Sequence, residues 1–398
     1  MSKINDLIKK LCANGVKYKK LEDCCNILDS KRKPVSKGVR EVGEYPYYGA
    51  NGIQDYINDY IFDGKYVLVG EDGSVQTAYG TPVVNWATGK IWVNNHAHII
   101  EEIDGVSLRY LYHYLQIVDV KDLIHGNIPK LNQRDFRNIR IAIPPLEVQE
   151  EIVRILDKFG ELEVELETEL EARKSQYEFW RDKVFEPKDT WTNKTMEELC
   201  TIITKQTGFD YSATIKPSLL DSKSDETYSF IQNKDFDGIR FNFDTDYYIP
   251  KNVADKYPKI TLDCPSILFS ISGKIGNVGL YESEKKAFIG GAIAICKLKP
   301  NLNNKYILYY LQSKYGQQYL FGNIKAASHL NVTVEAIRKI NIKFPSLDEQ
   351  KKIVNILDKF EGLINDISVG LPAEIELRRK QYEYYRNILL CFDEIKGE

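Results

Sequence analysis

The sequence predicts an α+β protein in which two pseudo-symmetric globular domains are joined by two long antiparallel coiled-coil helices. The first observation is a repeat: residues 143–159 (IPPLEVQEEIVRILDKF) align without a gap with residues 344–360 (FPSLDEQKKIVNILDKF), and ten of the seventeen positions are identical. Apolar residues recur at helical spacing after each copy, and strand-like segments precede each copy. A chain with two copies of one unit is expected to engage two equivalent partners.

Residues 1–143 are predicted to form the first globular domain. The strand-like segments in it are apolar, and glycine or asparagine turns separate them: residues 66–70, 90–93 and 98–101. A last strand over residues 139–143 is stopped by Pro144 and Pro145. The domain therefore ends where the repeated segment begins.

Residues 144–185 are predicted to form the first long helix. Apolar residues recur there at alternating steps of three and four, with one gap near Arg173, as in the seam of a coiled coil: Ile152, Ile155, Phe159, Leu162, Leu166, Leu170, Tyr177, Trp180 and Val184. A helix of about forty residues is roughly 60 Å long.

Residues 186–345 are predicted to repeat the plan of the first domain. Strand-like segments lie at residues 266–271, 292–298 and 340–344, and the last of them again precedes a proline. The start of this domain also resembles the start of the first one, since residues 196–202 (MEELCTI) match residues 21–27 (LEDCCNI). The duplication covers nearly the whole chain.

Residues 346–398 are predicted to form the second long helix. Ser346 and Glu349 have the spacing of a capping box, which places the start of the helix directly after the strand. Gly370 and Pro372 interrupt the pattern, and the apolar seam is expected to resume beyond them: Ile353, Leu357, Phe360, Ile364, Ile367, Tyr385 and Leu389. Because each helix has one apolar stripe, the two are expected to pack against each other.

Composition narrows the class of protein. The chain has no run of eighteen apolar residues and no signal-peptide pattern, so we expect it in the cytoplasm and not in a membrane. Its seven cysteines are scattered without a CxxC pair, which indicates reduced thiols and not a disulfide framework. A net charge of −3 limits nucleic-acid binding to local basic faces.

The repeated pattern LxxQxxIVxxLDxF behind two mixed domains resembles the specificity subunit of type I restriction-modification systems. The resemblance covers nearly the full chain, and order, spacing and duplication all agree with it. Segments of the two domains are also similar to target recognition domains of that family: residues 45–52, 60–73 and 89–98 in the first domain, and 269–276 and 288–292 in the second.

The resemblance implies a function for each part. Each globular domain would be a target recognition domain that reads one half of a bipartite site on double-stranded DNA. The helix pair would set the spacer and dock two modification (methyltransferase) subunits, and restriction (translocase and endonuclease) subunits can join such a complex. The sequence leaves open whether the system includes them or only methylates. S-adenosylmethionine would be bound by the methyltransferase subunits, so we expect no cofactor in this chain.

The residues also argue against chemistry in this chain. The motifs FxGxG and [DNS]PP[FYW] of DNA methyltransferases are absent, and the nearest sequence, residues 143–146 (IPPL), lacks the polar and aromatic residues that hold a flipped base. The acidic and basic cluster at residues 282–286 is typical of a solvated turn, and His96 and His98 have no third zinc ligand at a suitable spacing. We therefore expect no catalytic residue and no metal site.

Candidate DNA-binding residues are the polar and basic side chains predicted on loops, because these side chains carry the donors and acceptors that read base edges or hold phosphates. In the first domain they are Lys31, Arg32, Lys33, Tyr48, Asn51, Asn94, Asn95, His96, His125, Asn127, Lys130, Asn132 and Arg134. In the second they are Lys205, Gln206, Gln232, Asn233, Ser272, Lys274, Lys325, Ser328, His329 and Asn331.

Candidate partner-binding residues are polar or aromatic positions that recur identically in the two helices, since two copies of one partner would meet them. They are Gln149, Tyr177, Arg181, Gln350, Tyr382 and Arg386. The alternative for these positions is simple descent from a duplication within a coiled coil that has no partner.

Two other functions remain open from the sequence. A two-domain protein-protein adaptor would share the architecture but would bind no DNA. A self-sufficient DNA methyltransferase or nuclease would need a catalytic motif that the sequence does not display.

Overall fold

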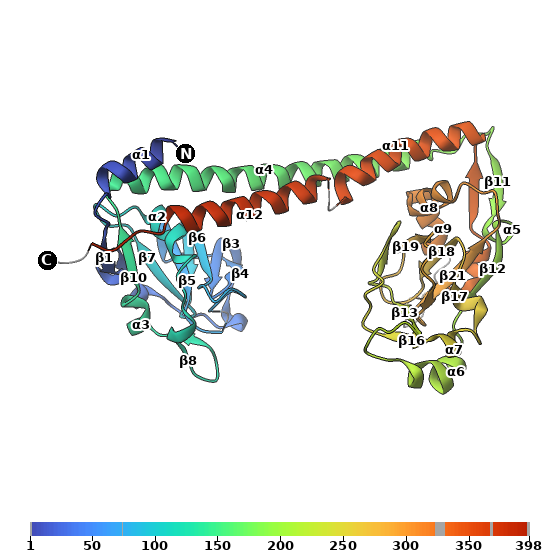
Figure 1. Cartoon of the computed structure of the whole chain (residues 1–398), viewed down its shortest axis with the longest axis horizontal. Helices are drawn as coiled ribbons and strands as arrows, with labels where there is room; N and C mark the ends of the chain where they lie inside the picture. The colour runs from blue at the N-terminus through green and yellow to red at the C-terminus, as the bar shows by residue number, and fades with distance from the viewer. Residues whose placement is uncertain (1, 74, 323–330, 367–368, 396–398) are drawn as a thin grey trace. The chain divides into compact units, whose positions relative to one another are not determined.

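The computed structural model describes residues 2–73, 75–322, 331–366 and 369–395. The chain forms two compact units: unit 1 comprises Met1–Thr168 with Glu374–Glu398, and unit 2 comprises Glu169–Ala373. Each unit has a globular α+β part covered by stretches of long helix (Figure 1). No helix in the described ranges is both long and apolar enough to cross a membrane.

Unit 1 is built on a six-stranded sheet with the order β2-β7-β5-β6-β3-β4. Neighbouring strands are antiparallel except β3 and β6, which are parallel. The elements are α1 (Ser2–Leu11), β1 (Lys17–Lys20), β2 (Asn26–Ile27), β3 (Val42–Gly49), β4 (Gly52–Ile57), β5 (Phe62–Gly70), β6 (Val84–Val93), β7 (Ala97–Glu101), α2 (Leu108–Leu115), β8 (Ile124–His125), β9 (Lys130–Leu131), α3 (Gln133–Arg137), β10 (Arg140–Ile143) and α4 (Leu146–Val184).

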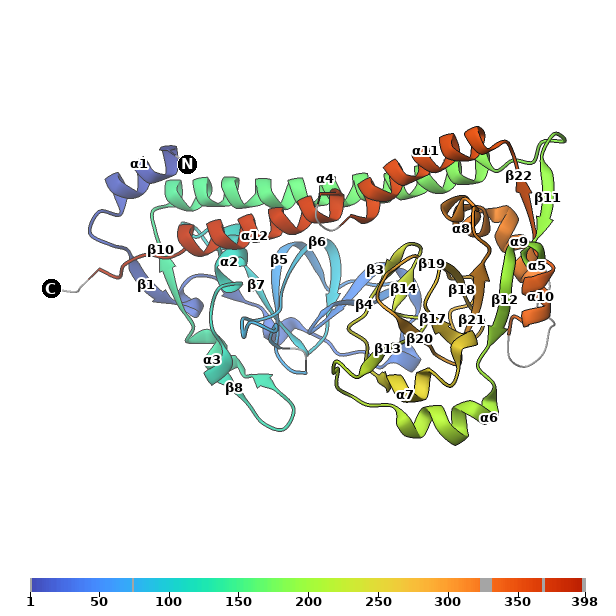
Figure 2. The ribbon, with the colours of Figure 1, turned by 45° about the vertical axis from the view of Figure 1, so that its right-hand side comes forward.

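Buried clusters of apolar side chains cover both faces of this sheet, and strand β5 contributes to each of them. Val67 and Val69 belong to the same buried cluster as Leu111 of α2, which lies over this end of the sheet in Figure 2. Leu68 points to the opposite face and packs in a separate cluster that includes Ile91. The alternation follows from the two-residue period of a strand.

Unit 2 has two four-stranded sheets, β12-β21-β18-β19 and β16-β13-β20-β17. Within them only β13 and β20 are parallel neighbours. The elements are β11 (Thr192–Thr195), α5 (Met196–Leu199), β12 (Cys200–Lys205), α6 (Gly208–Asp210), β13 (Thr227–Ile231), β14 (Phe236–Asp237), β15 (Arg240–Phe241), β16 (Tyr248–Pro250), α7 (Lys251–Ala254), β17 (Thr261–Leu262), β18 (Ser266–Ser270), β19 (Val278–Tyr281), β20 (Ala287–Ile289), β21 (Ile293–Leu298), α8 (Asn304–Gln312), α9 (Lys314–Gly322), α10 (Val334–Arg338), β22 (Asn341–Phe344) and α11 (Leu347–Asn365). Helix α12 (Leu371–Leu389) belongs to unit 1 from Glu374 onward, and the part of α4 from Glu169 onward belongs to unit 2.

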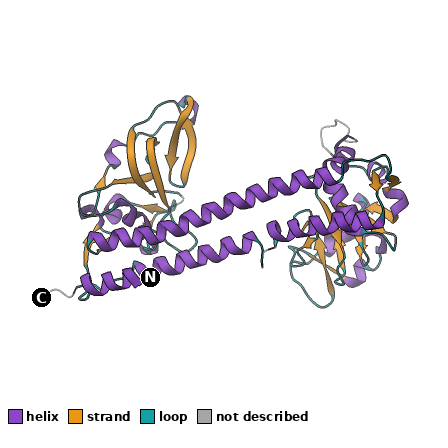
Figure 3. Cartoon of the chain, turned by 90° about the horizontal axis from the view of Figure 1, so that it is seen from above, coloured by secondary structure: helices purple, strands orange, loops and turns teal. Residues whose placement is uncertain are grey.

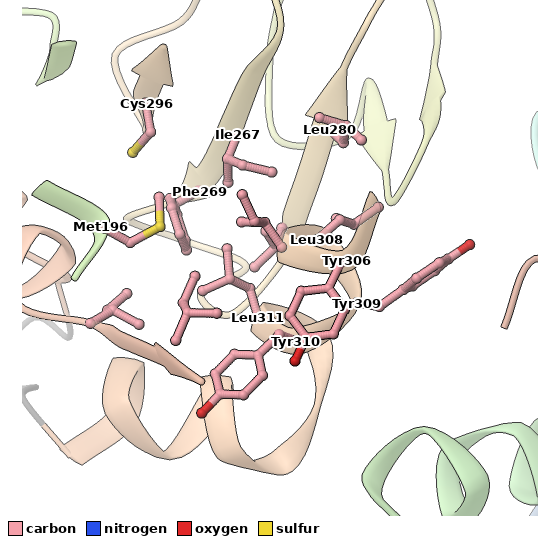
Figure 4. Close-up of a cluster of buried hydrophobic side chains, with 14 of the residues drawn as sticks. Met196, Ile267, Phe269, Leu280, Cys296, Tyr306, Leu308, Tyr309, Tyr310 and Leu311 are labelled. Carbon is pink, nitrogen blue, oxygen red and sulfur yellow. The ribbon is translucent and has the colours of Figure 1, made fainter. Parts of the chain in front are cut away.

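The core of unit 2 forms where helix α8 packs on its first sheet (Figure 4). Phe269 of β18 and Leu280 of β19 are buried in one cluster with Leu308 of α8. Tyr306 is also fully buried, and its hydroxyl donates to Lys343 O at 2.6 Å. A buried tyrosine needs such a partner, so this bond fixes α8 against the strand that precedes α11.

Both units share one frame, as the sequence repeat predicts. In unit 1 the first strand β1 pairs with the last strand β10, and in unit 2 β11 pairs with β22. The residue that follows each first strand donates to an equivalent carbonyl: Leu21 N to Ile139 O at 2.8 Å and Met196 N to Ile340 O at 2.9 Å. The weak match of residues 21–27 with 196–202 is therefore a true structural repeat.

The long helices pack along one another within each unit. In unit 1, Phe159 of α4 stacks on Tyr385 of α12, and Arg379 of α12 donates to Glu163 and Glu167 at 2.5 and 2.6 Å. In unit 2, Tyr177 of α4 meets Phe360 of α11 with ring centroids 6.3 Å apart. Aromatic rings and ion pairs thus share the seam with the aliphatic residues.

The second long helix is two helices, which corrects the prediction of one helix over residues 346–398. Helix α11 ends at Asn365 and α12 begins at Leu371, and Figure 3 shows the break. A Cβ on Gly370 would lie 2.7 Å from the carbonyl oxygen of Asp366, so this close approach requires glycine. Pro372 follows in the first turn of α12, where a proline is tolerated.

The end of the chain also departs from the helical prediction. Beyond Leu389 the backbone pairs with the segment that precedes β1: Val16 N donates to Asp393 O at 2.8 Å, and Ile395 N donates to Val16 O at 3.0 Å. Trp180 is 44% exposed and so is not a seam residue, and Ile367 lies outside the described residues.

Candidate nucleic-acid interface

A cavity of about 670 Å³ in unit 1 lies beside the turn that joins β6 to β7. Asn94, Asn95 and His96 of this turn line it, so the structure brings three of the predicted residues together. Asn94 is buried, accepts from His96 N at 2.8 Å and donates to Gln54 at 3.3 Å. It shapes the turn, whereas Asn95 and His96 are exposed.

The same cavity contains an arginine that the sequence prediction missed. The Arg40 guanidinium lies 4.1 Å above the Tyr47 ring, and its Nη1 donates to Asp55 at 3.2 Å. This hydrogen bond holds the pKa of the Asp55 carboxyl below its usual value. The sequence prediction missed Arg40 because this residue does not belong to a basic run. The fold of unit 1 brings it beside the β6–β7 turn.

Arg32, by contrast, is part of the interior and does not face a ligand. Its Nη1 lies 2.6 Å from Glu71 and donates to Ala97 O at 2.6 Å. Burial raises the pKa of the nearby Asp29 carboxyl, but the hydrogen bond from His98 and the charge of Arg32 bring it below its usual value. The prediction of a DNA contact by Arg32 is corrected to a structural ion network.

The carboxylates of this network are close enough to hold a cation. Ligand atoms of Asp29, Glu71 and His98 lie within 4.8 Å of one another, the one such group among the described residues. Arg32 and Lys130 already neutralise Glu71, at 2.6 and 3.2 Å, and Asp29 accepts from His98 at 2.7 Å. These donors use the oxygens that a metal would need, so we assign the group to packing and not to metal binding.

The remaining predicted residues of unit 1 divide by exposure. Tyr48 is buried, and Asn132 caps α3 by accepting from Asp135 N at 3.0 Å, so these two support the fold. Lys130 is half exposed beside Glu71. Free to meet DNA are the exposed side chains Lys31, Lys33, Asn51, His125, Asn127 and Arg134.

A second cavity, of about 680 Å³, lies in unit 2 at the ends of β12, β13 and β20. Lys205, Gln206, Gln232 and Asn233 line it, although they come from two segments of the chain. Backbone of the β20–β21 turn forms another wall, which includes Gly290, Gly291 and Ala292. The sequence prediction missed the remaining side chains of the wall, Thr207, Tyr211, Phe230, Lys234 and Ile293.

The other predicted residues of unit 2 lie outside this cavity. Ser272 contributes its carbonyl, which accepts from Asn233 Nδ2 at 2.7 Å, and Lys274 and Asn331 are exposed. The predicted residues Lys325, Ser328 and His329 lie outside the described residues.

The predicted partner-binding glutamines are interior residues, which corrects that prediction. Gln149 is 0% exposed, and its Nε2 donates to Pro144 O at 2.8 Å. Gln350 is 4% exposed and donates in the same way to Pro345 O at 2.9 Å. They recur because each fastens the start of its helix to the proline that precedes it.

The recurring tyrosines and arginines are also packed inward. Tyr177 is 6% exposed, and burial raises its pKa well above the usual value. Tyr382 donates to Gln116 at 3.3 Å, and Arg386 donates to the same oxygen at 3.0 Å. Arg181 lies over the Tyr177 ring, as Arg386 lies over Tyr382.

Exposed aromatic residues lie two positions further along each helix. Phe179 is 62% exposed and contacts Trp180 edge-on, with ring centroids 5.5 Å apart. Tyr384 is 63% exposed and contacts Tyr385 in the same way at 5.3 Å. Sequence reasoning missed this pair because it searched for identical residues, and these positions are conserved only as aromatic.

Five of the seven thiols are buried, whereas Cys264 is half-buried and Cys391 is exposed. Burial raises the pKa of Cys24 to about 11 and that of Cys25 to about 12, so both stay protonated at neutral pH. Cys12, Cys200 and Cys296 are buried as well.

A family profile described as the type I restriction modification DNA specificity domain matches the chain twice, over residues 14–173 and 188–377. The chain belongs to this specificity family. A Haemophilus influenzae protein assigned as a type I restriction enzyme specificity subunit is 35% identical over 97% of this chain and 98% of its own length. The specificity subunit of an Escherichia coli type I restriction enzyme is 30% identical over 72% and 71% of the two chains.

Solved structures of the specificity family share the fold. The type I restriction-modification S subunit from M. genitalium covers 94% of this chain and 96% of its own, with a TM-score of 0.53 and 13% identity. A chain from a study of complex assembly in a type I restriction-modification system covers 94% and 97%, with a TM-score of 0.58 and 14% identity. At such identities the likeness supports the fold alone.

Proposed function

We propose that this chain is the DNA-specificity subunit of a type I restriction-modification complex, and that each unit reads one half of a bipartite site on double-stranded DNA. One observation carries the proposal: the specificity profile matches twice, and each match covers one globular part and extends into the long helix that follows it. Two similar readers in one chain suit a site with two half-sites.

The two cavities are the proposed places of base readout. Each is lined by side-chain amides together with a basic group: Asn95 with His96 and Arg40 in unit 1, and Gln206 with Lys205 in unit 2. Amides and basic groups are the side chains that most often contact base edges and phosphates. The exposed lysines outside the cavities are assigned to phosphates.

The helices are the proposed docking surface for two modification (methyltransferase) subunits. Phe179 in unit 2 and Tyr384 in unit 1 occupy equivalent positions and are exposed to the same degree. Exposed aromatic residues are common anchors of protein interfaces. Because the two positions are equivalent, they suit two copies of one partner, and restriction subunits would then join the assembled complex.

The chain is proposed to carry out no chemistry of its own. The carboxylate group around Glu71 is occupied by Arg32 and Lys130, so it is not assigned a catalytic role. S-adenosylmethionine would be bound by the modification subunits, where the methyl transfer would occur.

The long helices are the proposed ruler for the unread spacer. Helix α4 alone has 39 residues, which is roughly 58 Å at 1.5 Å per residue. A helix of fixed length between two readers makes the distance between half-sites a property of the protein.

The test is methylation-resolved sequencing of genomic DNA from cells that carry the partner methyltransferase, with and without this chain. The expected result is a bipartite motif, two short half-sites around a fixed gap, that appears only with the chain. An exchange of residues 186–345 for another recognition domain is expected to change one half-site and leave the other. Absence of any chain-dependent motif, together with no salt-sensitive binding of duplex DNA by the complex, would overturn the proposal in favour of a protein-protein adaptor.

A further inference from the structure

The cavity of unit 2 contains two hydrogen-bond acceptors that nothing in the described chain satisfies. Gln206 Oε1 and Asn233 Oδ1 are buried and have no hydrogen-bond partner among the described residues. Gln206 is 4% exposed, and both residues line the cavity. Buried polar atoms in folded proteins are rarely left unpaired, so two in one cavity require an explanation.

The orientation of both amides is fixed by their own nitrogen atoms. Gln206 Nε2 donates to Ile289 O, and Asn233 Nδ2 donates to Ser272 O at 2.7 Å. A rotation of either amide would place its oxygen against a backbone carbonyl and would lose this bond. Each amide nitrogen therefore makes a bond to the backbone, whereas the two amide oxygens remain as unpaired acceptors.

The surroundings of the two oxygens are suited to a ligand that has a planar ring with negatively charged groups attached close to it. Phe230 and Tyr211 contribute aromatic surface to the wall, and Lys205 contributes positive charge, whereas Lys234 is paired with Asp246. The β20–β21 turn lies directly beside Gln206 Oε1, since a Cβ on Gly291 would be in van der Waals contact with this oxygen at 3.4 Å. This is the environment that a base and its phosphates require.

We propose that Gln206 and Asn233 select a base with an exocyclic amino group, adenine or cytosine, at one position of the half-site read by unit 2. The inference rests on the proposed function and adds the chemical identity of one base position to it. In the major groove adenine presents its N6 amino group and cytosine its N4 amino group. Either group supplies the donor that the two oxygens lack.

The same geometry excludes the other two bases. Thymine presents O4 at this place and guanine presents O6, and both are acceptors. When such an acceptor faces an amide oxygen, neither of the two oxygen atoms receives a hydrogen bond, and this costs binding free energy. Gln206 Nε2 already donates one of its two hydrogens to Ile289 O, so the contact with the base is assigned to Oε1. Adenine and cytosine are therefore expected to be accepted alike by these two amides.

The test uses the complete complex with its modification subunits and duplexes that carry the motif found by methylation sequencing. The half-site that changes when residues 186–345 are exchanged is the one read by unit 2. In that half-site, one position is expected to accept adenine and cytosine and to reject guanine and thymine. Replacing adenine there by purine, which lacks only the amino group, is expected to weaken binding roughly tenfold to a hundredfold.

Protein variants then identify the acceptors. With Gln206→Leu or Asn233→Ala, the loss on removing the amino group is expected to shrink or vanish, because the group has lost its partner. Gln317→Leu is the matched control: Gln317 Nε2 also donates to backbone carbonyls in unit 2, but the residue does not line the cavity. It is expected to leave the selectivity unchanged.

The outcomes separate the two levels of the proposal. If no chain-dependent bipartite motif exists, the proposed function is wrong. If the motif exists but no position in this half-site selects adenine and cytosine, or purine binds as well as adenine, only the base assignment is wrong. The purine experiment needs no variant, so a failure of Gln206→Leu to fold does not prevent the test.

Discussion

His113 Nε2 lies 2.8 Å from Asp157 Oδ1, and this pair joins α2 to α4 within unit 1. Unit 2 has the same joint with another chemical group, since Tyr309 donates to Asp358 at 2.6 Å between α8 and α11. A basic residue accompanies each pair: Arg109 donates to Asp157 at 2.8 Å, as Lys305 does to Asp358. The two joints thus differ mainly in that one contains a group that titrates near neutral pH.

Unit 1 is expected to lose stability as the pH falls below about 6.5. Burial lowers the pKa of His113, so the neutral imidazole belongs to the folded state and the unfolded chain binds the proton more tightly. For a lowered pKa the contribution is complete above the unfolded value and is lost as pH falls toward the folded one. The loss is at most about 1.4 kcal/mol for each pH unit. Hydrogen exchange of α2 amides at pH 7.5, 6 and 5 measures it.

His113→Tyr introduces the solution used in unit 2 and is expected to remove this pH dependence. His125→Gln is the control, because the His125 side chain is 65% exposed and its loss is expected to leave the slope intact. An unchanged slope in His113→Tyr would assign the effect to another group. Below about pH 4 both the unmodified protein and His113→Tyr are expected to lose stability as Asp157 becomes protonated. Burial raises the pKa of this carboxyl, but the hydrogen bonds from His113 and Arg109 bring it below its usual value.

Phe185→Ala is expected to destabilise unit 2 by about 3–5 kcal/mol. Phe185 is fully buried directly after α4 and meets the rings of Tyr306 and Tyr310 edge-on, at 5.3 and 5.4 Å. Its removal leaves a cavity at the base of α8. Phe179→Ala, at an exposed position of α4, is expected to change the free energy of unfolding by less than about 0.5 kcal/mol. Denaturant unfolding of the two variants, followed by hydrogen exchange of α8, compares them.

Phe179→Ser and Tyr384→Ser are each expected to reduce the number of modification subunits bound per chain from two to one. Each variant removes one of two equivalent aromatic anchors, and truncation of such an anchor typically costs about 2 kcal/mol or more of binding. Native mass spectrometry counts the subunits. Val164→Ser, which alters an exposed aliphatic residue of α4, should still bind two. Two subunits on both aromatic variants would place the docking surface elsewhere.

Removing one helical turn from both α4 and α12 is expected to shorten the recognised spacer by about two base pairs. One turn rises about 5.4 Å, and one base pair of DNA about 3.4 Å. The half-sites should not change, because neither cavity includes a residue of these helices. Methylation sequencing gives the motif directly, and an unchanged gap would refute the ruler.

The sequence was sufficient to predict the repeated frame of the fold. Strands β5, β7, β18 and β21 lie where apolar segments predicted them, and α4 begins at Leu146, directly after the two prolines. These features depend on local pattern, which one sequence displays. The β3–β4 hairpin and the second sheet of unit 2 were not predicted, because their strands are short or polar and are defined by their neighbours.

Site residues were predicted less completely, for a physical reason. Loop position selected Gln206 and Asn233, which line a cavity, but it also selected Arg32 and Asn94, whose polar atoms are used inside unit 1. A single sequence shows which side chains carry donors and acceptors. It does not show which of them the fold already satisfies, and that difference separates a structural arginine from a reader of DNA.

The pairing of Val16 with the segment around Asp393 has a consequence for biosynthesis. Unit 1 takes backbone hydrogen bonds from Asp393 and Ile395, which follow unit 2 in the sequence, whereas unit 2 is one uninterrupted stretch. On the ribosome, unit 2 has all of its residues before unit 1 does, and domains generally fold as units as they emerge. Unit 1 is thus completed after unit 2, although its first residues are synthesised before those of unit 2. A nascent chain that stops at the end of unit 2 has a complete unit 2 and an incomplete unit 1.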